Sequence, residues 1–291
     1  MQSQLLDCVQ IPRLRQAIAD NNTRVLGALP FDSISIGALL ELCCISYSWF
    51  RDQNALGMAV FERLAQIVPW VRPAFECLQR TIATPGNSRF FPCNSDFVLA
   101  VVSRKACFQE RLWTNFQQSF VDRLKEHGFQ PGFAIALSAA FGEIAENAPD
   151  HSAEGNAEMA PTMIGYFVTE GEVHFAVSDI GRGVLDSLRE NPRWRNLNNS
   201  REAILATLEK AATRKAEHLE GGGFKLALKS YVDRNGTLAI ASGDGIAHAG
   251  ADAQGRHVDC GFAPWFSGTR VAGSCFTKGL PKERAIPGLF N

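Results

Sequence analysis

Apolar residues in the second part of the chain recur first at helical spacing. One stripe includes Phe116, Phe120 and Leu124 and predicts a helix that ends near Gly128, a residue suited to a helix carboxyl end. A second apolar stripe predicts another amphipathic helix over 132–148. Two consecutive helices with one apolar face each need a common surface on which to pack.

Runs typical of strands follow these helices. Residues 162–168 and 173–178 are separated by four turn-forming residues and predict a hairpin. A helical pattern returns at 200–212, within a long polar stretch, and two more strands are predicted at 237–242 and 269–276. This order predicts an α+β fold, a two-layer sandwich with helices on one face of a mixed or antiparallel sheet.

The first 109 residues give weaker signals, because short apolar runs do not separate helices from buried strands. The patterns predict helices and strands as follows: helices near 10–20, 35–49 and 55–80, and strands near 24–28 and 97–102. We therefore divide the chain into three parts: an N-terminal sensor or partner-docking region over 1–109 of α/β or mostly helical fold, a domain over 110–277, and a tail over 278–291.

Composition excludes several classes of function. The chain has 291 residues and a formal net charge of −1, so no overall positive charge favours nucleic acid or anionic membranes. The most apolar run, 34–50, is interrupted by Glu41 and several serines, which argues against a membrane span. The eight cysteines form no Cys-x-x-Cys pair, which argues against zinc. Reduced thiols and no secretory signal predict a cytoplasmic protein.

The stretch "EIAENAPDH" places polar residues on the otherwise apolar second helix. Glu143 and Asn147 are four residues apart and therefore share a helix face. A carboxylate beside a carboxamide suits Mg²⁺, and Glu143 could act as a general base toward a water. The alternative is a solvent-facing polar stripe.

Two glycine-containing motifs follow. "DIGRG" begins with Asp179 directly after a strand, where its carboxylate could accept a hydrogen bond from an exocyclic amine; a tight turn is the alternative. "GGGFK" at 221–225 opens a predicted helix, where backbone N–H groups and Lys225 favour an anion; a flexible hinge is the alternative.

Together these motifs resemble those of the GHKL ATPase superfamily, which includes DNA gyrase, ninety-kilodalton heat-shock chaperones, sensor histidine kinases and MutL. "EIAENAPDH" is similar to its N-box, "DIGRG" to its first glycine box, "GGGFKLAL" to its second, and "SGTRV" at 267–271 to its terminal Gly-Thr. The resemblance covers about residues 110–277 and implies the GHKL (Bergerat) fold, the histidine-kinase-like ATP-binding domain, and the cofactors ATP and Mg²⁺.

The resemblance also implies a role for each matching residue. Glu143 would polarise the attacking water, Asn147 would bind Mg²⁺, and Asp179 would accept a hydrogen bond from the adenine amino group. Further binding positions would be Asp150 in the N-box, Gly181 and Gly183 beside the adenine, Gly221 and Gly223 at the phosphates, and Thr269 in support of Asp179. Residues 184–220 would form the lid over ATP.

Two residues depart from the family pattern. Lys225 stands where many members have a third glycine, which puts ordinary turnover in doubt. Pro149 follows the N-box closely and predicts that the helix ends there.

The superfamily does not fix the reaction. Only His127 precedes the ATP domain, at a helix end that is a poor phosphoacceptor site, so an orthodox histidine kinase is not expected. The sequence predicts an ATP-dependent stand-alone protein kinase or ATPase switch with a protein partner or phosphoacceptor, without nucleic acid or membrane, and leaves a homodimer open. The alternative is a non-catalytic interaction protein whose nucleotide pocket is a conformational latch.

Overall fold

The computed structural model describes most of the chain after residue 107 and selected parts before it. The described residues are 5–6, 11, 14, 17, 20, 33–51, 55–67, 72, 76, 89–92, 97–102, 108–152, 162–213, 229–232, 236–252 and 255–277.

The N-terminal part contains both helices and strands. Its elements are β1 (Leu5–Leu6), β2 (Ser33–Ile34), α2 (Ile36–Arg51), α3 (Ala55–Ile67), β3 (Arg89–Pro92) and β4 (Phe97–Val102). The helices predicted near 35–49 and 55–80 correspond to α2 and α3, and the strand predicted at 97–102 is confirmed as β4. The strand predicted near 24–28 lies outside the described residues.

The second part follows the predicted order of elements. Its helices are α5 (Arg111–Glu126), α6 (Pro131–Ser152), α7 (Gly183–Arg189), the 3-10 helix η4 (Pro192–Trp194) and α8 (Ser200–Lys210). Its strands are β5 (Thr162–Thr169), β6 (Glu172–Ser178), β7 (Gly236–Asp252) and β8 (Gly255–Phe276). The α+β class predicted from the sequence is therefore confirmed.

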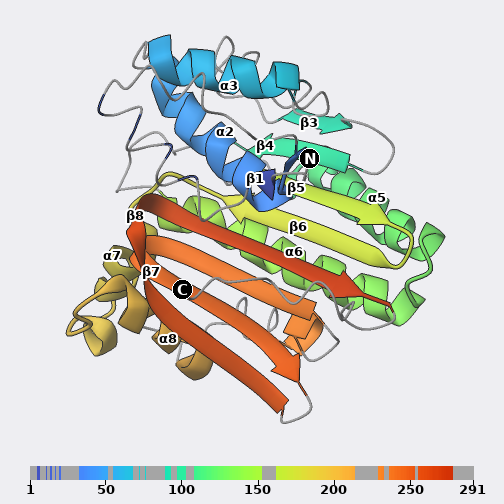
Figure 1. Ribbon diagram of the computed structural model, residues 1–291. Coiled ribbons are helices and arrows are strands. Elements are labelled where there is room, and N and C mark those ends of the chain that lie inside the picture. The colour runs from blue at the N-terminus through green and yellow to red at the C-terminus, as the bar shows by residue number, and fades with distance from the viewer. Residues whose placement is uncertain are drawn as a thin grey trace.

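Six of these strands form one antiparallel sheet in the order β3-β4-β5-β6-β8-β7 (Figure 1). β4 pairs with β5 along its whole length, from Phe97 opposite Phe167 to Val102 opposite Thr162. The sheet therefore continues across residue 109, where the sequence predicts a boundary between two regions.

Helices cover both faces of the central strands. The second part of the chain has α5, α6 and α8 on one face, as expected for a two-layer sandwich, and α2 of the N-terminal part adds a layer on the other face. On one face, α5 and α6 enclose an aromatic cluster that includes Phe120, Phe141, Tyr166 and Phe175. On the other face, α2 packs against Met163 and the neighbouring inward-facing residues of β4 to β6. Successive strand residues point to opposite faces, so strands that are apolar at nearly every position need a cover on both sides.

Two boundaries differ from the prediction. α6 continues through Pro149 to Ser152. A proline removes one N–H bond but leaves those of the following residues intact, so a final turn can follow it. β7 and β8 also pair well beyond the predicted strands, with irregular register at Gly243. The run after Gly243 is rich in glycine and alanine, residues that give little strand signal.

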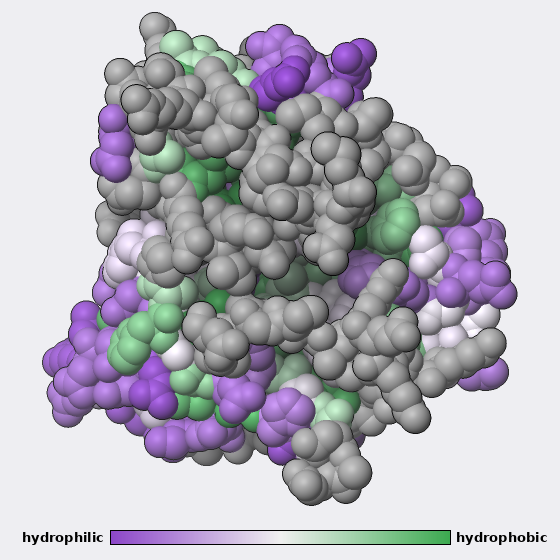
Figure 2. All heavy atoms as spheres, in the orientation of Figure 1, coloured by the Kyte–Doolittle hydropathy of each residue, from purple (hydrophilic) through white to green (hydrophobic). Residues whose placement is uncertain are grey.

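The segment predicted as a lid is structured in its first part. α7, η4 and α8 share a small apolar cluster that includes Leu188, Trp194 and Ala203. Figure 2 shows hydrophilic side chains over the region where α7 and α8 lie, as expected for helices with one apolar face. Residues 214–220, the end of the predicted lid, lie outside the described residues.

Candidate functional site

The site is built around Asp179, the residue that directly follows β6. Its side chain is 1% exposed. Its Oδ1 accepts hydrogen bonds from the backbone N–H of Gly181 at 2.8 Å and of Thr269 at 3.3 Å. Both bonds use the same carboxylate oxygen, so neither engages Oδ2. The structure thus brings together three of the residues singled out in the sequence: Asp179, Gly181 and Thr269.

Burial changes the ionisation of Asp179. Loss of hydration raises the pKa of its carboxyl from 3.8 to about 7, although the N–H groups of Gly181 and Thr269 oppose this shift. A buried carboxylate is unfavourable for folding unless it is neutralised. Carboxyl groups kept in such surroundings are frequently functional.

The raised pKa predicts how stability depends on pH. Below about pH 4 both the folded and the unfolded chain hold the Asp179 proton. Between about pH 4 and 7 the unfolded chain has released this proton while the folded chain still holds it. The free energy of unfolding therefore falls as pH rises through this window. The shift corresponds to on the order of 4 kcal/mol across this window. Asp179→Asn removes the ionisation and should be more stable than wild type at pH 8, with the difference vanishing near pH 4.

Urea unfolding at several pH values measures this difference. Asp186→Asn is the matched control, because Asp186 is an exposed carboxylate on the following helix. If the free energy of unfolding of Asp179→Asn depends on pH in the same way as that of wild type and of Asp186→Asn, burial does not raise the pKa of the Asp179 carboxyl.

Gly183 begins α7 with a positive φ of 83°. A Cβ atom there would lie 2.7 Å from Ser242 Oγ and 3.3 Å from the carbonyl oxygen of Gly268. Ser242 Oγ accepts a hydrogen bond from the backbone N–H of Val184 at 2.9 Å and donates one to the Gly268 carbonyl at 2.8 Å. The last glycine of "DIGRG" is thus required for docking α7 against β7 and β8, close to the irregular register at Gly243.

Gly268 brings β8 against the backbone of Asp179. It has a φ of 95°, and a Cβ atom would lie 2.1 Å from the Asp179 carbonyl oxygen. Beyond it, the Asp179 N–H donates to the Thr269 carbonyl at 2.9 Å. Ser242 Oγ lies 3.3 Å from Thr269 Oγ1, so two hydroxyl groups lie beside the aspartate-bearing strand end.

α6 carries Glu143 and Asn147, the two residues predicted to act at the phosphates. Phe141 of α6 contacts Phe175 of β6, with 5.4 Å between ring centroids, and α6 also contacts α7. Since α6 passes Phe175 at Phe141 and then meets the helix that follows Asp179, its carboxyl half lies toward the Asp179 end of β6. Glu143 is exposed and Asn147 is half-buried on this half of the helix.

The neighbouring Glu146 has a different environment. Its Oε1 accepts a hydrogen bond from Trp113 Nε1 at 3.0 Å, which ties α6 to α5. Glu143 is not hydrogen-bonded to any residue that the structure describes. Of the two glutamates in "EIAEN", Glu143 is therefore the one whose exposed carboxylate forms no hydrogen bond to the described residues.

The residues present fit a phosphate-bound Mg²⁺ better than an all-protein metal site. Among the described residues, no three His, Cys, Asp or Glu side chains cluster as metal ligands. Mg²⁺ usually takes one or two protein ligands and completes its shell with waters and phosphate oxygens. Asn147 would offer one carboxamide oxygen to such a shell.

Four of the predicted binding residues are either outside the described residues or described only in their backbone. Gly221, Gly223 and Lys225 lie outside the described residues, and only the backbone of Asp150, in the last turn of α6, is described. One other residue, Ser242, belongs to the site but was not singled out from the sequence, whereas Gly268 is the glycine of the Gly-Thr pair in "SGTRV". Ser242 is a single serine within β7, and it becomes informative only when β7 is known to pair with β8.

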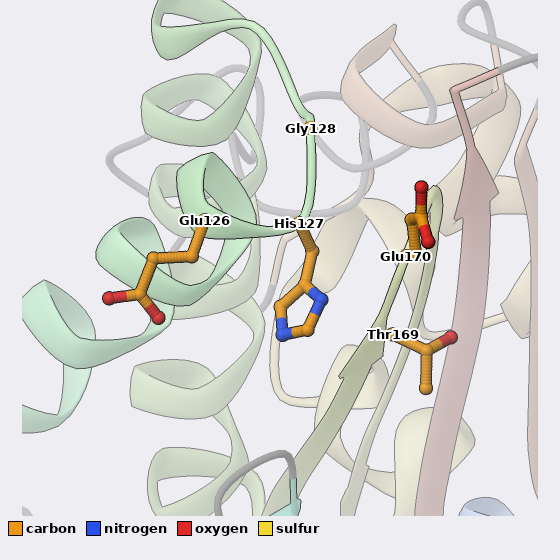
Figure 3. Close-up of a pocket in the computed structure, with 5 residues that line it drawn as sticks. All are labelled: Glu126, His127, Gly128, Thr169 and Glu170. Atoms are coloured by element: carbon orange, nitrogen blue, oxygen red, sulfur yellow. The ribbon is translucent and has the colours of Figure 1, made fainter.

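A surface hollow lies at the opposite end of β5 and β6. It has a volume of about 520 Å³ and is lined by Glu126, His127, Gly128, Thr169 and Glu170 (Figure 3). His127 follows α5, and its carbonyl oxygen accepts a hydrogen bond from the N–H of Gly171 at 3.0 Å. Since β6 runs its full length from this turn to Asp179, the hollow is separate from the site described above.

Comparison with known proteins adds no assignment. No protein-family model matches the chain, and no curated protein shows significant sequence similarity to it. None of the helices in the described part of the chain combines the length and hydrophobicity needed to cross a membrane.

Proposed function

We propose that this protein binds Mg²⁺-ATP in the manner of the GHKL superfamily and acts as a stand-alone protein kinase or ATPase switch. One observation carries the proposal: the buried Asp179 carboxylate is held by the N–H groups of Gly181 and Thr269. These residues come from two motifs about 90 positions apart, and both motifs resemble those of the superfamily. A structural turn alone accounts for the contact of Asp179 with Gly181 but not for its contact with Thr269.

The chemistry of each group suits this function. Asp179 would accept a hydrogen bond from the adenine amino group and so select adenine over guanine. Bound Mg²⁺ would neutralise phosphate charge, with Asn147 as a protein ligand. Glu143, exposed on the same helix face, would take the proton from an attacking water or from the hydroxyl group of a partner protein.

Asp179→Asn tests the nucleotide site. The substitution keeps an oxygen for the two backbone donors and removes the charge that strengthens the bond to adenine. A charge-assisted hydrogen bond contributes about 1.5–3 kcal/mol, so affinity for ATP should fall roughly tenfold or more. The preference for ATP over GTP should weaken as well.

Isothermal titration of wild type and of Asp179→Asn with ATP and with GTP, in the presence of Mg²⁺, measures both quantities. Asp186→Asn is again the control and should bind like wild type, because its carboxylate is exposed on α7. Wild-type affinity in Asp179→Asn would remove this residue from the nucleotide site. A wild-type protein that binds no nucleotide would overturn the proposed function.

Lys225 favours a second candidate, a non-catalytic latch. It stands at the position of a glycine in many superfamily members, and a long side chain there would restrict the phosphate loop. Incubation with labelled ATP, alone and with cell lysate, separates the two. Phosphate release or a labelled partner supports the kinase or ATPase; tight binding with neither supports the latch.

A further inference from the structure

Two buried polar contacts join α2 to β6 and β8 beside the residues of the candidate site. The Glu41 carboxylate of α2 forms an ion pair with the Arg270 guanidinium of β8, and their side chains are 2% and 4% exposed. Arg270 is the residue after Thr269. A buried pair of charges must be well oriented to be tolerated, so this contact fixes the position of β8 relative to α2.

The second contact is one helical turn further along α2. Cys44 Sγ donates a hydrogen bond to the Ser178 carbonyl at 3.0 Å. Burial is the main cause that raises the pKa of the Cys44 thiol, with contributions from the Asp179 and Glu41 charges, so the thiol remains protonated and able to donate. Ser178 is the residue before Asp179.

The two contacts meet the sheet at a single pair of residues. Ser178 lies opposite Arg270 in the β6–β8 ladder. One position further, the Asp179 N–H bonds to the Thr269 carbonyl, and the Thr269 N–H bonds to Asp179 Oδ1. Because side chains alternate between faces, Arg270 faces α2 while Thr269 faces the other side of the sheet. α2 therefore supports the Asp179–Thr269 pair through contacts on the face of the sheet opposite to the Thr269 side chain.

We infer that α2 is a positioning element for nucleotide recognition: Glu41 and Cys44 set the placement of Asp179 and Thr269, and through them the selectivity for adenine. This inference rests on the proposed function. The two contacts connect the N-terminal region to the site. Any partner or signal that shifts α2 would also move Ser178 of β6 and Arg270 of β8. By reciprocity, a nucleotide bound at Asp179 acts on α2.

Cys44→Ala and Cys43→Ala form the matched test. Both thiols are buried in α2, and both substitutions remove one sulfur from the same cluster. Cys44 is the thiol that donates to the Ser178 carbonyl. We expect Cys44→Ala to reduce the ratio of ATP to GTP affinity about threefold or more, and Cys43→Ala to leave it unchanged. A purely structural defect would weaken both nucleotides equally and preserve the ratio.

Glu41→Gln is the second variant. It keeps a hydrogen-bonding oxygen near Arg270 and removes the negative charge, so the ratio should fall further than in Cys44→Ala. Because this variant leaves a buried charge without its carboxylate, it could fail to fold. Hydrogen exchange of wild type then serves as the independent measurement: the amides of residues 38–46 should exchange several-fold more slowly with Mg²⁺-ATP than without it.

The outcomes distinguish a failure of the inference about α2 from a failure of the proposed function. If wild type binds ATP but Cys44→Ala keeps the wild-type ratio and exchange in 38–46 does not respond to nucleotide, the inference about α2 is overturned and the proposed function stands. If wild type binds no nucleotide, both are overturned. A lowered ratio in Cys44→Ala, with Cys43→Ala unchanged and protected amides in α2, supports the inference.

Discussion

Glu143→Gln should retain Mg²⁺-ATP binding and lose turnover by a factor on the order of 10² to 10⁴, the usual contribution of a general base. Glutamine preserves the shape and hydrogen bonding of the side chain but accepts no proton. Glu143 is exposed and free of hydrogen bonds to the described residues, so its replacement should leave stability close to that of wild type. Phosphate release and partner labelling, measured at saturating ATP, give the rate.

Two further variants on α6 make the test specific. Glu146→Gln is the matched control: Glu146 bonds to Trp113, so this change should affect stability slightly and turnover little. Asn147→Ala should weaken binding of Mg²⁺-ATP while binding of ATP without the metal changes less. Equal turnover in wild type and Glu143→Gln would exclude Glu143 as the base.

Gly268→Ala should destabilise the fold by about 2 to 5 kcal/mol and abolish nucleotide binding. The added Cβ would lie 2.1 Å from the Asp179 carbonyl oxygen, so β8 and the Asp179 backbone must move apart. Left-handed backbone strain of about 1–2 kcal/mol and overpacking of about 1–3 kcal/mol contribute to the loss. Denaturant unfolding gives the free energy, and titration with ATP gives the affinity.

Gly255→Ala is the control for backbone strain alone. Gly255 has a φ of 117°, and a Cβ atom there would have no neighbour within 4 Å. Its loss of stability should therefore be limited to about 1–2 kcal/mol, with nucleotide binding retained. If the two variants lose similar amounts of stability, the close approach of Gly268 to Asp179 does not constrain this part of β8.

Strong periodicity made most of the second half predictable. α5, α6, the β5–β6 hairpin and α8 were confirmed close to their predicted bounds, because each carries an apolar face at its own spacing. The long pairing of β7 with β8 was missed, because residues such as Gly245, Ala247 and Ala249 fit a strand without indicating one. Pairing with a neighbouring strand, rather than local propensity, decides such segments.

The candidate site was only partly predictable for a related reason. Asp179 and Thr269 were singled out together only through the resemblance, and the structure brings them into contact. Ser242 and the Glu41–Arg270 pair were missed, since their roles depend on residues 27 and 229 positions away in sequence. Local patterns carry no information about contacts at that separation until the sheet order is known.

The pairing of β4 with β5 has a practical consequence for studies of residues 110–277 in isolation. A fragment starting at residue 110 would lack β3 and β4 and leave β5 as an edge strand, with the backbone groups that pair with Phe97–Val102 open to other molecules. It would also lack α2 and so bare the apolar surface around Met163. Unprotected edges and exposed apolar faces promote aggregation. The first 109 residues thus cover an edge and an apolar face of this sheet that would otherwise be open to aggregation.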